Sequence, residues 1–116
     1  MSLLQRLSRF FKRVPQSVSF DDEKVVRTRR NGQTESVRWA DLSRVSVITT
    51  GDGPWSEDVF LVLEGTEGGC AVPQGAAGSN LLLTRLQALP GFNNQAFINA
   101  MGCASNERFI CWERAS

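Results

Sequence analysis

The first fifteen residues have the hydrophobic spacing of an amphipathic helix. The apolar positions fall on one side of a helical wheel: Leu3, Leu4, Leu7, Phe10, Phe11 and Val14. Basic and polar side chains occupy the rest of the circumference. Ser2 can cap the first turn, and Pro15 ends the helix because its ring disfavours helical geometry at the preceding residue. We therefore expect a basic amphipathic helix over residues 1–15.

From Ser17 onward the spacing changes to the alternation that is typical of β-strands. Runs of apolar and β-branched residues, separated by glycine, proline and acidic turns, predict strands at 17–20, in two arms of a hairpin within 24–39, and at 44–50, 58–65, 70–75 and 108–114. The run 58–65 is apolar at consecutive positions, so we expect both of its faces to be covered.

Asn31-Gly32 is the strongest short hairpin signal in the chain, because a two-residue type I′ turn needs positive φ at both central positions. Such a turn sets Val26 opposite Val37 on one face of the hairpin. The other face then carries Arg27 together with Val25, Arg29, Ser36 and Arg38. We interpret this basic face as solvated, since no aromatic side chains alternate with the arginines as stacking on nucleic-acid bases would require.

The last third of the chain predicts two helices. Ser79 can cap the leucine-rich run 80–89, and Asn93 or Asn94 can cap the run 95–101. With 116 residues, the chain has the size of one domain. We expect a basic helix over 1–15 and a single α+β domain over 16–116, with a largely antiparallel sheet of six or seven strands and two helices near the C-terminus. The predicted core consists of Trp39, Phe60, Leu61, Leu63, Leu82, Leu86 and Phe97.

Several stretches carry a resemblance to other proteins: "SVRWADL", "VITTGDGPWSEDVF", "GCAVPQGAAG", "LLTRLQALPGFNNQAFINAMG" and "RFICW". Together they resemble a family of short, uncharacterised bacterial proteins for which no function is known. The resemblance implies a bacterial cytoplasmic setting and assigns no catalytic residue. The order of antiparallel strands followed by helices is also similar to that of pleckstrin-homology-like domains, a common interaction scaffold. The strand predicted after the helices departs from that pattern.

The composition excludes several classes of enzyme. The chain has no histidine, so Ser-His-Asp and Cys-His catalysis cannot be assembled within it. Its three cysteines, Cys70, Cys103 and Cys111, form no CxxC pair, and we interpret them as small buried hydrophobic residues. No phosphate-binding or dinucleotide-binding motif is present. We expect neither enzymatic activity nor a cofactor.

Charge is unevenly distributed although the net charge is only +1. Residues 1–15 carry four basic side chains and no acidic one, whereas residues 45–84 carry five carboxylates and no basic side chain. The small net charge argues against nucleic acid as a partner. The acidic block could instead form a counter-surface for the basic helix.

Part of the acidic block lies in a loop, "TTGDGPWSED", that contains glycine, proline and a large indole. One interpretation is a plain turn with the indole tucked beneath it. A second is a partner-binding loop formed by Asp52, Trp55, Glu57 and Asp58. A third is a carboxylate site that binds a divalent cation or supports hydrolysis, although no EF-hand pattern is present.

These observations favour a small non-enzymatic interaction or regulatory protein that binds another protein in the cytoplasm. The helix over 1–15 could cover the domain, join a second copy or lie on a membrane; the residues that would make a partner or membrane contact are Arg6, Arg9, Phe10, Phe11, Lys12 and Arg13. Peripheral membrane association through this helix is an alternative function, and a carboxylate-based metal-binding protein or hydrolase is another. An organelle transit segment also fits the pattern, but the bacterial resemblance argues against it.

Overall fold

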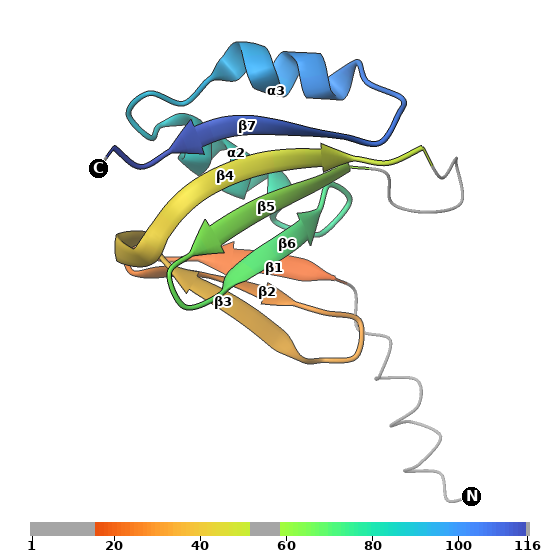
Figure 1. Cartoon of the computed structure of the whole chain (residues 1–116). Helices are drawn as coiled ribbons and strands as arrows, with labels where there is room; N and C mark the ends of the chain where they lie inside the picture. Colours follow the sequence, from red (N-terminus) through yellow and green to blue (C-terminus); the bar gives the residue numbers. More distant parts are fainter. Residues whose placement is uncertain (1–15, 52–58, 116) are drawn as a thin grey trace, which may run out of the picture.

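The computed structural model describes residues 16–51 and 59–115, which form seven strands and two α-helices (Figure 1). The strands are β1 (Ser17–Phe20), β2 (Lys24–Thr28), β3 (Thr34–Arg38), β4 (Leu42–Thr49), β5 (Val59–Gly65), β6 (Gly69–Pro73) and β7 (Glu107–Glu113). The helices are α2 (Ser79–Gln87) and α3 (Asn94–Met101), and a single 3-10 turn, η1 (Trp39–Asp41), connects β3 to β4.

The strands form two antiparallel sheets and not the one sheet that we expected. One sheet has the order β1-β2-β3, and the other has the order β6-β5-β4-β7. The division falls at η1, where the short 3-10 turn redirects the chain so that β4 begins a new sheet instead of continuing beside β3. The α+β class, the antiparallel pairing and the number of strands are confirmed for the described residues. The predicted helix over 1–15 lies outside them.

The observed register of the β2–β3 hairpin differs from the predicted register by one residue. Arg29 N donates to Gln33 O at 2.8 Å, and Gly32, whose φ is +86°, lies in the turn, so the loop has three residues instead of two. Val25 consequently pairs with Val37, and Arg27 pairs with Glu35. Because successive side chains alternate between faces, this slip places Arg27 on the buried face, where it is 9% exposed. The prediction of a solvated basic face was therefore wrong for Arg27.

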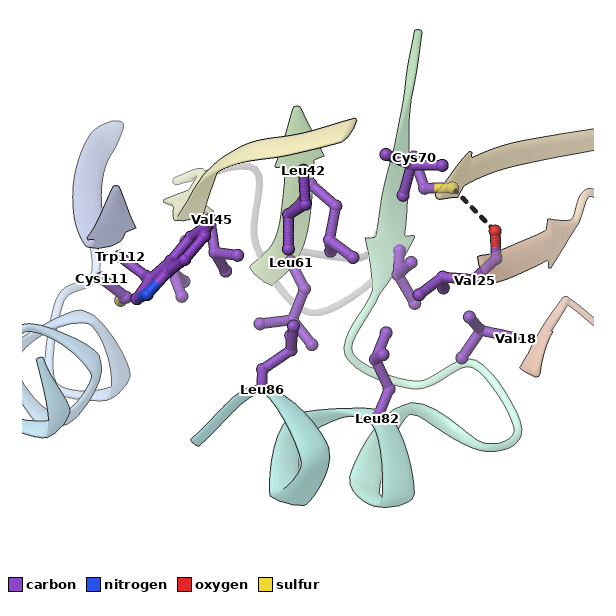
Figure 2. Packing of buried hydrophobic residues seen from close by; sticks show 14 of the residues in the cluster. Val18, Val25, Leu42, Val45, Leu61, Cys70, Leu82, Leu86, Cys111 and Trp112 are labelled. Carbon is purple, nitrogen blue, oxygen red and sulfur yellow. Dashed lines mark hydrogen bonds between the residues drawn. The ribbon is translucent and has the colours of Figure 1, made fainter. Parts of the chain in front are cut away.

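Helix α2 covers the interior of the sheets. Leu82 and Leu86 are fully buried and point from the helix toward residues of both sheets (Figure 2). The sequence suggested that Ser79 caps this helix, but it does not. Gly78, with φ of +89°, occupies the cap position, and the Ser79 hydroxyl donates to Gln74 O at 2.6 Å. In Figure 1, α2 lies behind the β6-β5-β4-β7 sheet.

Helix α3 runs beside β7 (Figure 1). The predicted cap is confirmed, because the Asn93 side chain accepts a hydrogen bond from Ala96 N at 3.0 Å. Ala100 is fully buried, and Phe97 packs against the core while remaining partly exposed.

Strand β7 contains an irregularity that the sequence pattern did not indicate. Strict alternation would place Cys111 and Trp112 on opposite sides. In the structure Val45 pairs with Trp112 and Ser46 pairs with Ile110, so Cys111 is an extra residue, a β-bulge. Both Cys111 and Trp112 are buried as a result.

The predicted core is confirmed for the four leucines, Leu61, Leu63, Leu82 and Leu86, all of which are buried. Trp39 and Phe97 are partly buried and pack against the core. Phe60 was placed wrongly, because it pairs with Ile48 on the opposite face of the larger sheet.

The two sheets meet where β6 faces the β2–β3 hairpin. The Glu35 carboxylate accepts a hydrogen bond from Ala71 N at 3.3 Å. The Cys70 thiol lies 4.0 Å from Val25 O, the contact that is dashed in Figure 2. Strand β6 lies at the edge of its sheet, so these contacts cover an edge that would otherwise offer unpaired backbone groups.

Candidate functional site

The site residues predicted from the sequence all lie outside the described part of the chain. This applies to the loop residues Asp52, Trp55, Glu57 and Asp58. It applies equally to the helix residues Arg6, Arg9, Phe10, Phe11, Lys12 and Arg13. Their roles stay predictions, and the candidate site described below is a different one.

A groove of about 350 Å³ opens where three distant parts of the chain meet: η1, the end of α2 and the end of β7. We call it the tryptophan groove. Its lining residues are Trp39, Leu42, Arg85, Leu89, Pro90, Trp112, Glu113, Arg114 and Ala115. Its size suits one or two side chains of a partner better than a large cofactor.

Trp39 forms one wall and is held from two sides. Its indole N–H donates to Asp21 O at 2.8 Å. The ring of Phe20 meets it edge-on, with centroids 6.2 Å apart and an interplanar angle of 87°. The Arg85 guanidinium, from α2, lies over the Trp39 ring at 4.5 Å from the centroid, within the range of a cation–π interaction.

Trp112 forms the second wall and is nearly buried. Its indole N–H donates to Pro90 O at 2.9 Å, which ties β7 to the segment after α2. The Arg114 guanidinium lies 5.6 Å from the centroid of the Trp112 ring. Arg114 also donates to Leu42 O at 2.8 Å and to Trp39 O at 2.9 Å. It therefore connects the two walls of the groove.

Two arginines of the groove, Arg85 and Arg114, have no ion-pair partner among the described residues. Glu113, which also lines the groove, pairs with Arg44 at 3.0 Å. Both indole N–H groups are already engaged with backbone carbonyls. What remains for a ligand is the partly exposed Trp39 ring beside two guanidinium groups.

Sequence reasoning missed this groove because its residues come from three separate segments. Trp39 was assigned to the core, and the two arginines were not singled out. One signal was available: Trp112 and Arg114 are two residues apart in an extended segment, so their side chains point to the same side. That spacing indicates a stacked pair, but it does not reveal the opposite wall.

The three thiols differ in their surroundings, since Cys70 and Cys111 are buried and Cys103 is partly exposed. Burial raises the pKa of Cys70 to about 11, and burial also raises the pKa of Cys111. Hydrogen bonds with the Ser105 side chain, with the Ser105 backbone and with the Thr49 hydroxyl, in that order of effect, lower the pKa of Cys103. Cys103 lies between α3 and β7. Residues 16–51 and 59–115 contain no group of three or more cysteines and carboxylates that could hold a metal ion.

Comparison with known proteins adds no assignment: no family model, curated protein or solved structure matches this chain. Among the helices that the structure describes, none has the length and apolar character needed to cross a membrane.

Proposed function

We propose that this protein is a non-enzymatic interaction module that binds an acidic segment of another protein in the tryptophan groove. The observation that carries the proposal is the pair of stacked arginines, Arg85 and Arg114, which face the groove without a carboxylate partner among the described residues. An apolar side chain of the partner would contact the exposed part of the Trp39 ring, and a neighbouring carboxylate would bind the guanidinium groups.

The chemistry of the lining favours recognition over catalysis. Tryptophan and arginine are the residue types most enriched among those that dominate binding energies at protein interfaces. A hydrogen bond to a charged group contributes roughly 1.5–3 kcal/mol. The only carboxylate among the described lining residues, Glu113, is already paired, so none of these residues offers an unpaired carboxylate as an acid or base. A small groove whose charged contacts come from two arginines suits a transient complex.

The test is a selection from a random-peptide phage library with three forms of the full chain. The wild type should enrich peptides in which an acidic residue adjoins an apolar one. Arg85→Glu should lose that enrichment because the new carboxylate in the groove repels the acidic residue of the peptide. Arg30→Glu is the matched control: it makes the same charge change in the exposed β2–β3 turn, away from the groove, and should enrich the same peptides as the wild type.

Thermal unfolding of the three proteins shows whether each variant is folded before its selection is interpreted. Arg85 is exposed, so Arg85→Glu should stay folded. Selection of peptides without an acidic preference would overturn the proposal. So would an Arg85→Glu protein that selects the same peptides as the wild type.

A further inference from the structure

The larger sheet has an apolar face that does not point into the core. Strand alternation places Ile48, Phe60, Val62 and Ile110 on the side opposite to the buried valines and leucines. The first three are partly exposed, and Ile110 is 42% exposed. We call these four side chains the outer patch. A strand such as β5, apolar on both faces, is usually covered on both.

Ion pairs surround and cross the outer patch: the Arg108 Nε donates to Ser46 Oγ at 3.3 Å, between Val62 and Ile110, and the paired charges neutralise one another. Glu64 pairs with Arg108 and, at 3.6 Å, with Arg44, which in turn pairs with Glu113 at 3.0 Å. These two arginines and two glutamates carry no net charge together. A strongly basic segment can therefore approach this face without net repulsion from its border.

The described chain begins at the end of the sheet where the outer patch is most apolar. Gln16 O accepts a hydrogen bond from Ala77 N at 3.0 Å. Ala77 follows closely after Gln74, whose N–H donates to Val59 O at the start of β5. Phe60 is the next residue of that strand. Gln16 thus lies near the end of the larger sheet at which β5 begins, the end that also carries Phe60.

We propose that residues 1–15 pack as an amphipathic helix across the outer patch. A helix of this length spans about 22 Å, and four strands at their usual spacing are about 14 Å wide, so the segment can cross the sheet. Its stripe of leucines and phenylalanines covers the exposed apolar side chains, and its arginines and lysine face water. A second copy of the chain and a membrane surface are the competing occupants.

The chain contains three isoleucines, two of which, Ile48 and Ile110, belong to the outer patch. The third, Ile98, lies on α3, is 59% exposed and is an internal control. Methyl NMR of the full-length protein with labelled isoleucine therefore reports on the outer patch directly. Two variants carry the same new charge in the first segment: Leu7→Asp alters the apolar stripe, and Ser8→Asp alters the polar face.

In Leu7→Asp the methyl resonances of Ile48 and Ile110 should shift toward the values of solvent-exposed isoleucine, while Ile98 stays unchanged. Ser8→Asp should leave all three in place. If Leu7→Asp shifts the methyl resonances of neither Ile48 nor Ile110, the proposal is wrong. If the two resonances move on dilution of the wild type, a second copy is the occupant. If they move only when anionic phospholipid vesicles are added, the occupant is a membrane.

Discussion

Arg27 joins three parts of the fold through a side chain that is nearly buried. It donates to the Glu35 carboxylate at 3.1 Å and to the Gln16 side-chain oxygen at 2.6 Å. Glu35 in turn accepts from the backbone N–H of Ala71. The Nε of Arg27 has no hydrogen-bond partner among the described residues. Because one of its donors is already unsatisfied, the guanidinium depends heavily on Glu35.

Replacement of Glu35 by glutamine should lower the free energy of unfolding by about 2 kcal/mol, because it leaves a buried cation without a counter-charge. The double variant Arg27→Met/Glu35→Gln should be more stable than Glu35→Gln alone, since it removes the uncompensated charge and keeps an acceptor for Ala71. Urea denaturation followed by tryptophan fluorescence measures both. A double variant that is less stable than Glu35→Gln would contradict this account.

Cys103 should be the most reactive thiol in the native protein. Its hydrogen bonds favour the thiolate and lower its pKa, whereas Cys70 and Cys111 are buried and have raised pKa values. Iodoacetamide labelling, read by peptide mass spectrometry, should modify Cys103 first, with a half-maximal rate at a pH below the ordinary thiol value. Ser105→Ala should move that midpoint upward. Faster labelling of Cys70 would show that this assignment is wrong.

At the scale of elements, two glycines at the ends of α2 both have positive φ, but only one of them is also packed closely against another element. Gly78 (φ +89°) starts α2, and Gly91 (φ +83°) follows it. A Cβ atom at Gly91 meets open space, whereas one at Gly78 overlaps the carbonyl oxygen of Val18. Strand β1 is held there by the hydrogen bond from Val18 N to Ala77 O, so it cannot yield easily.

Gly91→Ala should therefore lower the free energy of unfolding by about 1 kcal/mol, the cost of a left-handed conformation for an ordinary residue. Gly78→Ala should cost at least about 3 kcal/mol, because a backbone clash is added to the same conformational cost. Chemical denaturation of the two variants side by side tests the difference. Equal losses would mean that β1 adapts to the new side chain.

The elements themselves were largely predictable from the sequence because each depends on local periodicity and on caps. The Asn93 cap is an example, since a single side chain and a nearby N–H define it. The register of the β2–β3 hairpin and the bulge at Cys111 were not predictable in this way. Asn31-Gly32 fits both a two-residue and a three-residue loop, and burial of Val25 and Val37 selects between them. Such selection requires knowledge of the other sheet.

The contact between the two sheets is a property of the whole molecule, and Cys70 reports on it. Burial, assisted by the negative charge of Glu35, raises the pKa of this thiol from 9.0 to about 11. Because the folded pKa lies above the unfolded one, folding favours the protonated thiol. The stability contribution is complete below pH 9 and is lost as the pH rises toward 11.

The free energy of unfolding of the wild type should thus fall more steeply between pH 9 and pH 11 than that of Cys70→Ala, which has no thiol to ionise. The slopes are compared, not the absolute values, since alanine also removes core volume. Urea denaturation at a series of pH values provides both slopes. Parallel slopes would mean that Cys70 ionises as readily in the folded protein as in the unfolded chain.

The tryptophan groove is also a property of the whole molecule, because separate elements line it. It was therefore less predictable from the sequence than the individual elements were. Trp39, Arg85 and Arg114 become neighbours only after β4, α2 and β7 have assembled around a shared core. Sequence periodicity describes each element separately, and so it correctly assigned these segments without indicating that their ends converge. A pair such as Trp112 and Arg114 is visible in the sequence, but its partner wall is not.

Strand β4 pairs with β5 on one side and with β7 on the other. The ribosome synthesises β5 soon after β4 and β7 much later. Strand β5 follows after nine residues, whereas β7 emerges only after both described helices. A nascent chain therefore presents one edge of β4 with unpaired N–H and C=O groups for most of its synthesis. Premature termination before β7 would leave the β4–β5 hairpin as a template for strands of other chains. Truncated products should consequently aggregate or engage chaperones during translation, even though the finished sheet pairs both edges of β4.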